Sequence, residues 1–147
     1  MNVKERLKGM WNATSSPHQI ALGFTAGLTL SMIPVPVVGM LAGIGLAGLL
    51  RANLVSAYVG TAVMNPVTGP VIFFAELWLG LTIMRMPVPA WADVRHSSAS
   101  QWVEMLRNLA GPFGIGIAML MVASIVLGYP LSFALAKVLK KRFHHEA

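Results

Sequence analysis

The chain has 147 residues, of which 56% are hydrophobic and 11% charged, whereas about 25% of the residues in an average soluble domain are charged. This composition excludes an ordinary water-soluble globular domain. The chain contains no cysteine and four scattered histidines, so disulfides and thiolate metal sites are excluded, and we expect neither a metal nor a cofactor. The formal net charge is +6. The basic residues gather near the two ends and form no nucleic-acid-binding motif, which favours a lipid bilayer with anionic headgroups over nucleic acid as the partner.

Apolar residues lie in long blocks without charge. No Asp, Glu, Lys or Arg occurs between Lys8 and Arg51 or between Arg107 and Lys137, and blocks of this length are typical of membrane helices. We therefore expect an all-α integral membrane protein. Short broken helices are predicted to form helical hairpins, and one C-terminal helix is predicted to span the bilayer, all within a single membrane domain over residues 1–147.

The first half of the chain contains a predicted surface segment and a predicted hairpin. Residues 1–16 are expected to form an amphipathic interfacial segment, because their apolar residues recur at helical spacing. Residues 17–51 are expected to form a helical hairpin broken at Pro34–Pro36, since two prolines two positions apart cannot lie inside a helix. Each half has 14 residues, or about 21 Å as a helix against a hydrocarbon core of about 30 Å. The hairpin is therefore either re-entrant or spans thinned lipid.

A similar pattern follows over residues 53–85, with its break at Asn65–Pro70. Pro36 precedes Arg51 by fifteen positions, and Pro70 precedes Arg85 by the same number. This spacing is consistent with a repeated broken-helix unit, as in transporters with duplicated halves, or with coincidence.

The last third is predicted to contain a polar loop over residues 86–111 and a spanning helix with a basic tail over residues 112–142. Ser98 and Gln101 have capping-box spacing, which indicates a short interfacial helix in the loop. Pro112 is expected to open the last helix, which Gly128–Pro130 would kink. The apolar stretch from 113 to 136 has 24 residues, or about 36 Å as a helix, enough to span unaided. Excess Lys and Arg near both termini predict that both termini are cytoplasmic.

The proline breaks are candidate binding elements. Pro34, Pro36 and Pro66 lie at the two breaks and are candidate site residues. Pro36 and Pro70 each stand where a new helix is expected to begin, and such helix N-termini present free N–H groups and a positive dipole to an anion. The alternative is that these prolines only form tight hairpin tips, which requires no ligand.

Polar side chains near the breaks complete the candidate site. Arg51 is either a deep functional cation or a residue that reaches lipid headgroups. Asn53, Asn65 and Thr68 can satisfy freed backbone groups or contact a substrate. Glu76 lies in an apolar block, so we expect it to be paired, for instance with Arg51, protonated, or in contact with water, and a proton-coupling role follows from the second case.

Small residues recur every fourth position at two places, namely at Gly23 and Gly27 and at Gly39 and Gly43. This spacing lets helices approach closely, either within one subunit or between copies, and we expect a homo-oligomer. The sequence contains no recognised catalytic motif, so an enzyme is not expected.

Several motifs in order resemble a known bacterial membrane protein family, "domain of unknown function 2062". The resemblance covers residues 10–80 and, less regularly, the last helix. It is carried by the segments Ser16–Phe24, Pro34–Pro36, Arg51–Asn53 and Asn65–Pro70, with the last of these continuing to Gly80. The resemblance implies a protein of the bacterial inner membrane and carries no known activity.

Two functional hypotheses follow. In the first, the protein binds or translocates an anionic substrate such as a lipid phosphate through its broken helices. In the second, it is a membrane scaffold or interaction protein without transport activity, which recruits a partner through glycine-lined helix faces. Only a few crossings are predicted, which leaves little room for a pathway in one subunit.

Overall fold

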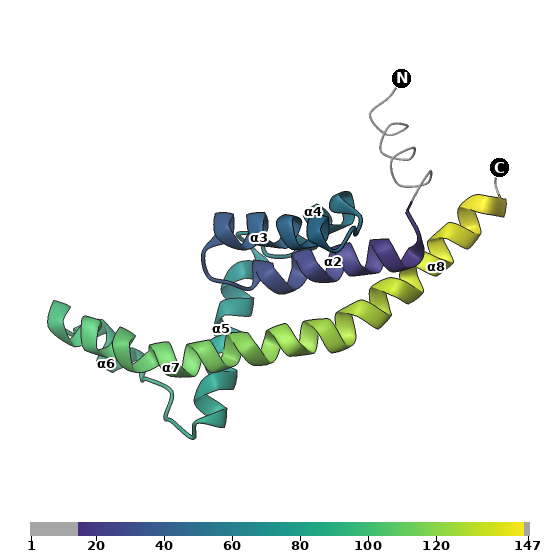
Figure 1. Ribbon diagram of the computed structural model, residues 1–147. Coiled ribbons are helices and arrows are strands. Elements are labelled where there is room, and N and C mark those ends of the chain that lie inside the picture. The colour runs from purple at the N-terminus through teal and green to yellow at the C-terminus, as the bar shows by residue number, and fades with distance from the viewer. Residues whose placement is uncertain (1–14, 146–147) are drawn as a thin grey trace. The chain divides into compact units, whose positions relative to one another are not determined.

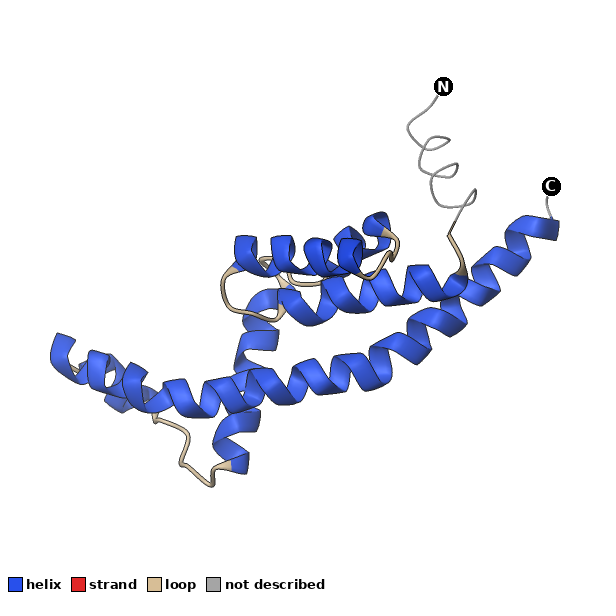
Figure 2. Cartoon of the chain, in the orientation of Figure 1, coloured by secondary structure: helices blue, strands red, loops and turns tan. Residues whose placement is uncertain are grey.

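The computed structural model describes residues 15–145, and within this range every regular element is helical (Figures 1 and 2). This confirms the predicted all-α class, while the predicted interfacial segment over residues 1–16 lies almost entirely outside the described residues. The chain divides into two compact units, each described by itself below: unit 1 comprises Met1–Asn65 and Met121–Ala147, and unit 2 comprises Pro66–Leu120. The elements in order are α2 (Pro17–Ser31), α3 (Pro36–Leu49), α4 (Leu54–Thr61), α5 (Thr68–Ile83), α6 (Trp91–His96), α7 (Ala99–Ala123), the π-helical turn η1 (Ser124–Gly128) and α8 (Tyr129–His145).

Helix α2 begins at a capping box and ends before the first proline break. The Ser16 hydroxyl accepts a hydrogen bond from the Gln19 backbone N–H at 3.2 Å, and the Gln19 side chain accepts one from the Ser16 N–H at 2.8 Å. These two bonds satisfy N–H groups that a helix start leaves free. The chain then turns at Pro34, and α3 begins at Pro36. Proline is favoured at the start of a helix because the N–H that it lacks would have no partner within the helix.

Glycines bring α2 into close contact with α4 and α3. A Cβ added to Gly27 would overlap the carbonyl oxygen of Ala57 on α4, and one added to Gly60 would overlap the carbonyl oxygen of Phe24. On α3, a Cβ at Gly43 would lie 3.0 Å from the Cα of Gly27. Backbone therefore packs directly on backbone, which is typical of helix pairs that cannot rely on large core side chains.

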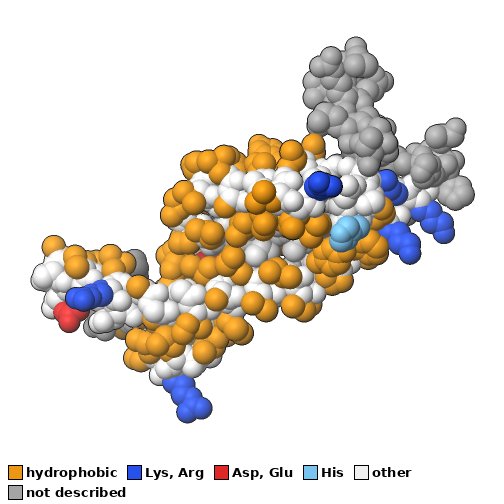
Figure 3. All heavy atoms as spheres, in the orientation of Figure 1, with side chains coloured by type: hydrophobic (Ala, Val, Ile, Leu, Met, Phe, Trp, Pro, Cys, Tyr) orange, Lys and Arg blue, Asp and Glu red, His pale blue; other side chains and the backbone are white. Residues whose placement is uncertain are grey.

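The interior of unit 1 is built from small and polar side chains. Its buried cluster consists of Ala26, Ala47 and Ala57, and the hydroxyls of Thr29 on α2 and Ser124 on η1 form a buried hydrogen bond of 2.7 Å. Large apolar side chains face outward instead, as the orange surface in Figure 3 shows. This distribution is the reverse of that in a water-soluble protein.

Unit 2 is held by a close crossing of α5 and α7, here called the α5–α7 crossing. A Cβ at Gly80 would overlap the carbonyl oxygen of Pro112, and a Cβ at Gly116 would overlap the carbonyl oxygen of Glu76. Close by, the rings of Phe73 and Phe113 lie 4.5 Å apart between centroids. Two helical positions four residues apart on each helix thus form one backbone contact.

The predicted boundary at Pro112 is wrong, because α7 begins at Ala99 and continues through Pro112. The predicted short interfacial helix and the predicted spanning helix are one helix. Pro112 removes one helical N–H, but it is buried against Gly80, so packing at the crossing offsets the loss. Ser98 still marks the start, since its N–H donates to the Gln101 side chain at 2.8 Å.

The expected distortion near Gly128–Pro130 is present as a π-helical turn. The five residues Ser124–Gly128 widen the helix just before Pro130, which gives room to a ring that would clash with the preceding turn. The helix then continues to His145, three residues beyond the end predicted at residue 142.

Candidate functional site

The first proline break and Arg51 lie at opposite ends of α3. Pro34 is exposed in the turn between α2 and α3, whereas Arg51 follows the last turn of α3. A helix of 14 residues separates its ends by about 21 Å. The structure therefore does not bring these predicted site residues into one pocket of unit 1.

Arg51 occupies a left-handed backbone conformation, with φ of 53°, directly after α3. Its N–H donates to the Gly48 carbonyl at 3.1 Å, and the Ala52 N–H donates to the Ala47 carbonyl at 2.8 Å. This pair of bonds is a Schellman motif, in which glycine is the usual left-handed residue. A charged, exposed arginine thus stands where glycine is preferred.

Asn53 is used as a helix cap. Its side-chain oxygen accepts a hydrogen bond from the Ser56 N–H at 2.8 Å, and its amide nitrogen donates to the Ser15 hydroxyl at 2.7 Å. The Asn53 side chain is 8% exposed, and both of its polar atoms form hydrogen bonds within the chain. Of the two roles expected for Asn53, this arrangement favours hydrogen bonding to free backbone groups over contact with a substrate.

The second break lies where the two units join in sequence. Asn65, the last residue of unit 1 in this stretch, is exposed and donates from its amide to the Ala62 carbonyl at 3.3 Å. Pro66 is exposed, and Thr68 begins α5 half-buried. Asn65 and Pro66 therefore lie in the connection between the two units, and Thr68 lies at the start of α5.

Glu76 lies at the α5–α7 crossing and is 1% exposed. Its carboxylate atom Oε1 has no hydrogen-bond partner among the residues that the structure describes. It is the one acidic side chain in the otherwise apolar helix α5. Arg51 belongs to unit 1 and Glu76 to unit 2, and the expected pairing between them stays a prediction.

Arg85, which follows Pro70 by fifteen positions, is not one of the predicted site residues. Its φ is also 53°, its N–H donates to the Thr82 carbonyl at 3.2 Å, and the Met86 N–H donates to the Leu81 carbonyl at 2.9 Å. These bonds reproduce those after α3 at an offset of 34 residues. The shared fifteen-residue spacing in the sequence was the available signal.

Arg51 lies at the end of unit 1 where α2 begins. The Gln19 side-chain amide donates to the Arg51 carbonyl at 3.3 Å, and the Asn53 N–H donates to the Gln19 carbonyl at 3.0 Å. Both contacts connect the end of α3 to the first turn of α2.

Helix α8 runs antiparallel to α2 and brings lysines to the same end. Ser124 lies beside Thr29, and Tyr129, further along, contacts His18 with 2.6 Å between Oη and Nδ1. Thirteen residues after Ser124, about 20 Å along the helix, the lysines begin. We call the set Arg51, Lys137, Lys140 and Lys141 the basic end of unit 1.

A largely apolar cavity of about 380 Å³ lies between α2, α4 and α8. Ser56 and Ser132 are the hydroxyl-bearing residues of its wall, and Leu139 at one end of the lining directly precedes Lys140. The remaining lining side chains or backbone come from Ile20, Phe24, Leu28, Val59, Gly128, Leu131, Leu135 and Ala136.

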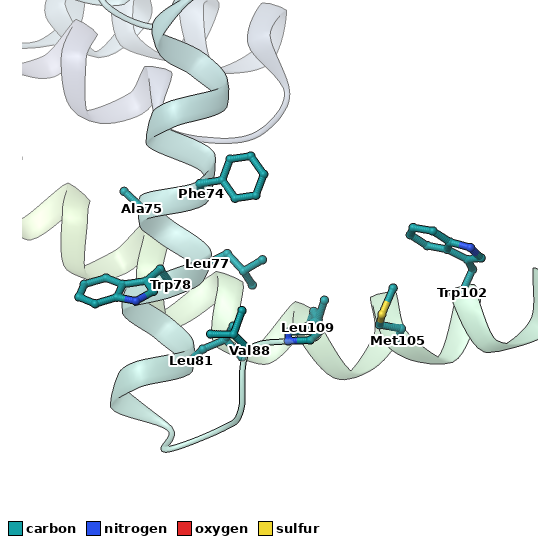
Figure 4. Close-up of a pocket in the computed structure, with 10 residues that line it drawn as sticks. Phe74, Ala75, Leu77, Trp78, Leu81, Val88, Trp102, Met105 and Leu109 are labelled. Carbon is teal, nitrogen blue, oxygen red and sulfur yellow. The ribbon is translucent and has the colours of Figure 1, made fainter. Parts of the chain in front are cut away.

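A second cavity, of about 610 Å³, lies within unit 2 between α5, the segment after it, and α7. Figure 4 shows Phe74 and Trp78 on α5 and Trp102 and Met105 on α7 around this space. Its lining contains no charged residue. It is therefore suited to apolar groups and not to an ionic substrate.

These features define an all-helical protein with a small-residue interior and apolar outer faces. One helix within the described range, Ala99–Lys141, is long and apolar enough to cross a membrane. The family described as "Uncharacterized protein conserved in bacteria (DUF2062)" matches residues 2–145, so the chain belongs to this family, as the sequence motifs had indicated. No curated protein and no solved structure matches the chain.

Proposed function

We propose that the chain is a small multi-pass protein of the bacterial cytoplasmic membrane that binds the phosphate of an anionic lipid at the basic end of unit 1. The observation that carries the proposal is an apolar cavity whose lining includes Leu139, the residue directly before Lys140. An acyl chain fits such a cavity, and a phosphate would meet the cations at its end.

The membrane location is supported by the exposed apolar surface. Leu49 is 83% exposed, Phe74 70% and Trp78 61%, while the buried cluster of unit 1 is made of alanines. Exposure to water costs about 25 cal/mol per Å² of apolar surface, and a bilayer removes this cost. Small residues inside and large apolar residues outside are the arrangement that lipid-facing helices adopt.

The proposed orientation places the basic end in the cytoplasm and the segment between α5 and α7 outside. Lys141 at the end of α8 and Ser98 before α7 are both exposed, so each can report its side as a single cysteine in a chain that has none. We expect a membrane-impermeant maleimide to label Ser98→Cys in spheroplasts and Lys141→Cys only in inverted vesicles. Labelling of both variants from one side contradicts this orientation.

Lipid binding is tested by the thermal shift of the purified protein on addition of phosphatidylglycerol or phosphatidylcholine. A bound ligand raises the unfolding temperature according to its affinity. Each cation near a headgroup contributes about 1 kcal/mol, so Arg51→Gln and Lys137→Gln are each expected to weaken phosphatidylglycerol binding about fivefold. The matched controls are Arg95→Gln and Arg107→Gln, exposed residues of unit 2.

Two results would contradict the lipid proposal. One is an equal shift with phosphatidylcholine, which would indicate a general effect of acyl chains. The other is an unchanged phosphatidylglycerol shift in Arg51→Gln and Lys137→Gln, which would show that these cations do not contact the headgroup.

A scaffold role is the second candidate, favoured by one outward-facing glycine. A Cβ on Gly45 would meet nothing within 4 Å, whereas one on Gly39 would lie 2.6 Å from the Leu30 carbonyl oxygen. Gly39 and Gly43 therefore pack within the chain, and replacing them tests folding. Gly45→Leu tests assembly instead, and the assay is crosslinking in membranes. Loss of a dimer in this variant supports a scaffold role. An unchanged dimer, or a parent protein that is monomeric, opposes it.

A further inference from the structure

Glu76 occupies a buried position in unit 2 that does not tolerate a charged side chain. It is 1% exposed, and its own carbonyl oxygen lies against Gly116 of α7. Its Oε1 accepts no hydrogen bond from any residue that the structure describes. An ionised carboxylate without a partner in such surroundings costs several kcal/mol, and it avoids this cost by taking up a proton.

The α5–α7 crossing offers no cation to balance a negative charge. The residues that α7 brings against this part of α5 include Pro112, Phe113 and Gly116, none of which is ionisable. Apart from Glu76, the charged residues of α7 and of the turn after α5 in unit 2 are Glu104, Arg107 and Arg85, and all three are exposed. Arg107 lies nine residues before Gly116 on α7, or about 13 Å along the helix axis.

We propose that Glu76 is a proton-binding site embedded at the α5–α7 crossing, neutral when α5 and α7 are packed together. Loss of the proton would leave an unpaired charge on a side chain that is 1% exposed, on a residue whose backbone lies directly against α7, so deprotonation would require the crossing to loosen or admit water. The inference rests on the membrane location proposed above, and it adds a proton as the ligand of unit 2.

Dicyclohexylcarbodiimide tests the site, because this apolar reagent reacts with protonated carboxyls in apolar surroundings. The full-length protein is treated in native membranes between pH 5.5 and 9, then purified, and modification is located by peptide mass spectrometry. We expect Glu76 to be modified at least about tenfold more than Glu104 at low pH. Once the group titrates, the rate should fall with rising pH, approaching tenfold per unit.

Controls separate the roles of the two carboxyls. Glu76→Gln removes the modification and Glu104→Gln leaves it unchanged, while a water-soluble carbodiimide with an amine should modify Glu104 and spare Glu76. Glu76→Gln mimics the neutral acid, so it should unfold at the same temperature as the parent, whereas Glu76→Lys should not. The labelling of the parent protein is read by mapping and does not depend on whether any variant folds.

Several outcomes would overturn the proposal. Glu76 unmodified at every pH in folded protein would exclude an accessible protonated carboxyl, and modification independent of pH would exclude a titrating one. Protection by sodium ions at constant pH would show a metal cation as the ligand in place of the proton. Release of the protein from membranes by alkaline carbonate would refute the membrane location separately, since labelling of purified protein in detergent still tests the burial.

Discussion

Two glycines on one helix are expected to respond in opposite ways to the same substitution. A Cβ on Gly116 would overlap the Glu76 carbonyl oxygen and would lie 2.5 Å from its carbonyl carbon and 3.0 Å from its Cα. All three atoms belong to the backbone of α5, which cannot move aside as a flexible side chain does. Two residues earlier, a Cβ on Gly114 would meet nothing within 4 Å.

The magnitude follows from two terms. Replacing glycine by alanine inside a helix gains about 1 kcal/mol of helix propensity, and this gain is common to both positions. Overpacking costs about 1 to 3 kcal/mol, and contact with backbone indicates the upper value for Gly116. Gly114→Ala should therefore be stabilised by up to about 1 kcal/mol and Gly116→Ala destabilised by about 2 kcal/mol, a difference of about 3 kcal/mol.

The assay is reversible unfolding in mixed micelles with increasing dodecyl sulfate, followed by far-UV circular dichroism and by the fluorescence of the tryptophans in unit 2. The free energy of unfolding is compared between the two alanine variants and the parent. Equal stability of the two variants would refute the α5–α7 crossing as described. A Gly116→Ala variant more stable than Gly114→Ala would refute it more strongly.

Three further predictions concern unit 1, and the last of them extends to Arg85 in unit 2. A double-mutant cycle of Thr29→Val and Ser124→Ala should give a coupling energy near 0.6 kcal/mol and below about 1.7 kcal/mol, the range of hydrogen bonds between membrane helices, and additive effects in the same micelle assay would exclude the bond. Asn53→Ala should lose about 1 kcal/mol of unfolding free energy through the lost cap, while Asn53→Ser keeps most of it; equal losses would contradict capping. Arg51→Gly should be more stable than Arg51→Ala by about 0.5 to 1 kcal/mol, because glycine relieves a left-handed strain of about 1 to 2 kcal/mol and repays part of it in the unfolded state. The same order is expected at Arg85, and the reverse order at either position in thermal melts would exclude the left-handed conformation there.

The helical hairpin and its turn could be predicted because proline acts locally. Two prolines two positions apart remove N–H groups whatever surrounds them, and the Ser16–Gln19 capping box is equally local. The long helix through Pro112 could not be predicted in this way. The cost of an internal proline is local, but the contact that offsets it comes from Gly80 on another helix, and no local pattern shows which glycine lies there.

The candidate site was predictable in its residue types and not in its grouping. Glu76 stood out as an acid in an apolar block, and the structure adds its burial and its unpaired oxygen. Glycines at four-residue spacing indicated close helix packing, but spacing alone does not separate Gly43, which lies against Gly27, from Gly45, which faces outward. The direction that a helix face points depends on its neighbours, which the sequence does not list.

The fifteen-residue spacing of Pro36–Arg51 and Pro70–Arg85 shows how far a sequence repeat extends into structure. Both helices end with the same left-handed arginine and the same pair of hydrogen bonds at an offset of 34 residues. Their contact residues differ, however. The position equivalent to Gly43 in α5 is Leu77, which lines a cavity, whereas the contact of α5 runs through Gly80.

A contact shifted by three positions, from the equivalent of Gly43 to Gly80, turns by only about 60° around the helix axis, so the two helices use overlapping faces but different residues for their closest contact. The common feature is therefore the helix end, where an arginine complements the dipole and extends its side chain outward. Two equivalent binding half-sites would require equivalent residues to line them, and the closest contact residues of the two helices, Gly43 and Gly80, are not equivalent. The geometry supports two helices that each end at a left-handed arginine, α3 in unit 1 and α5, which carries Glu76, in unit 2.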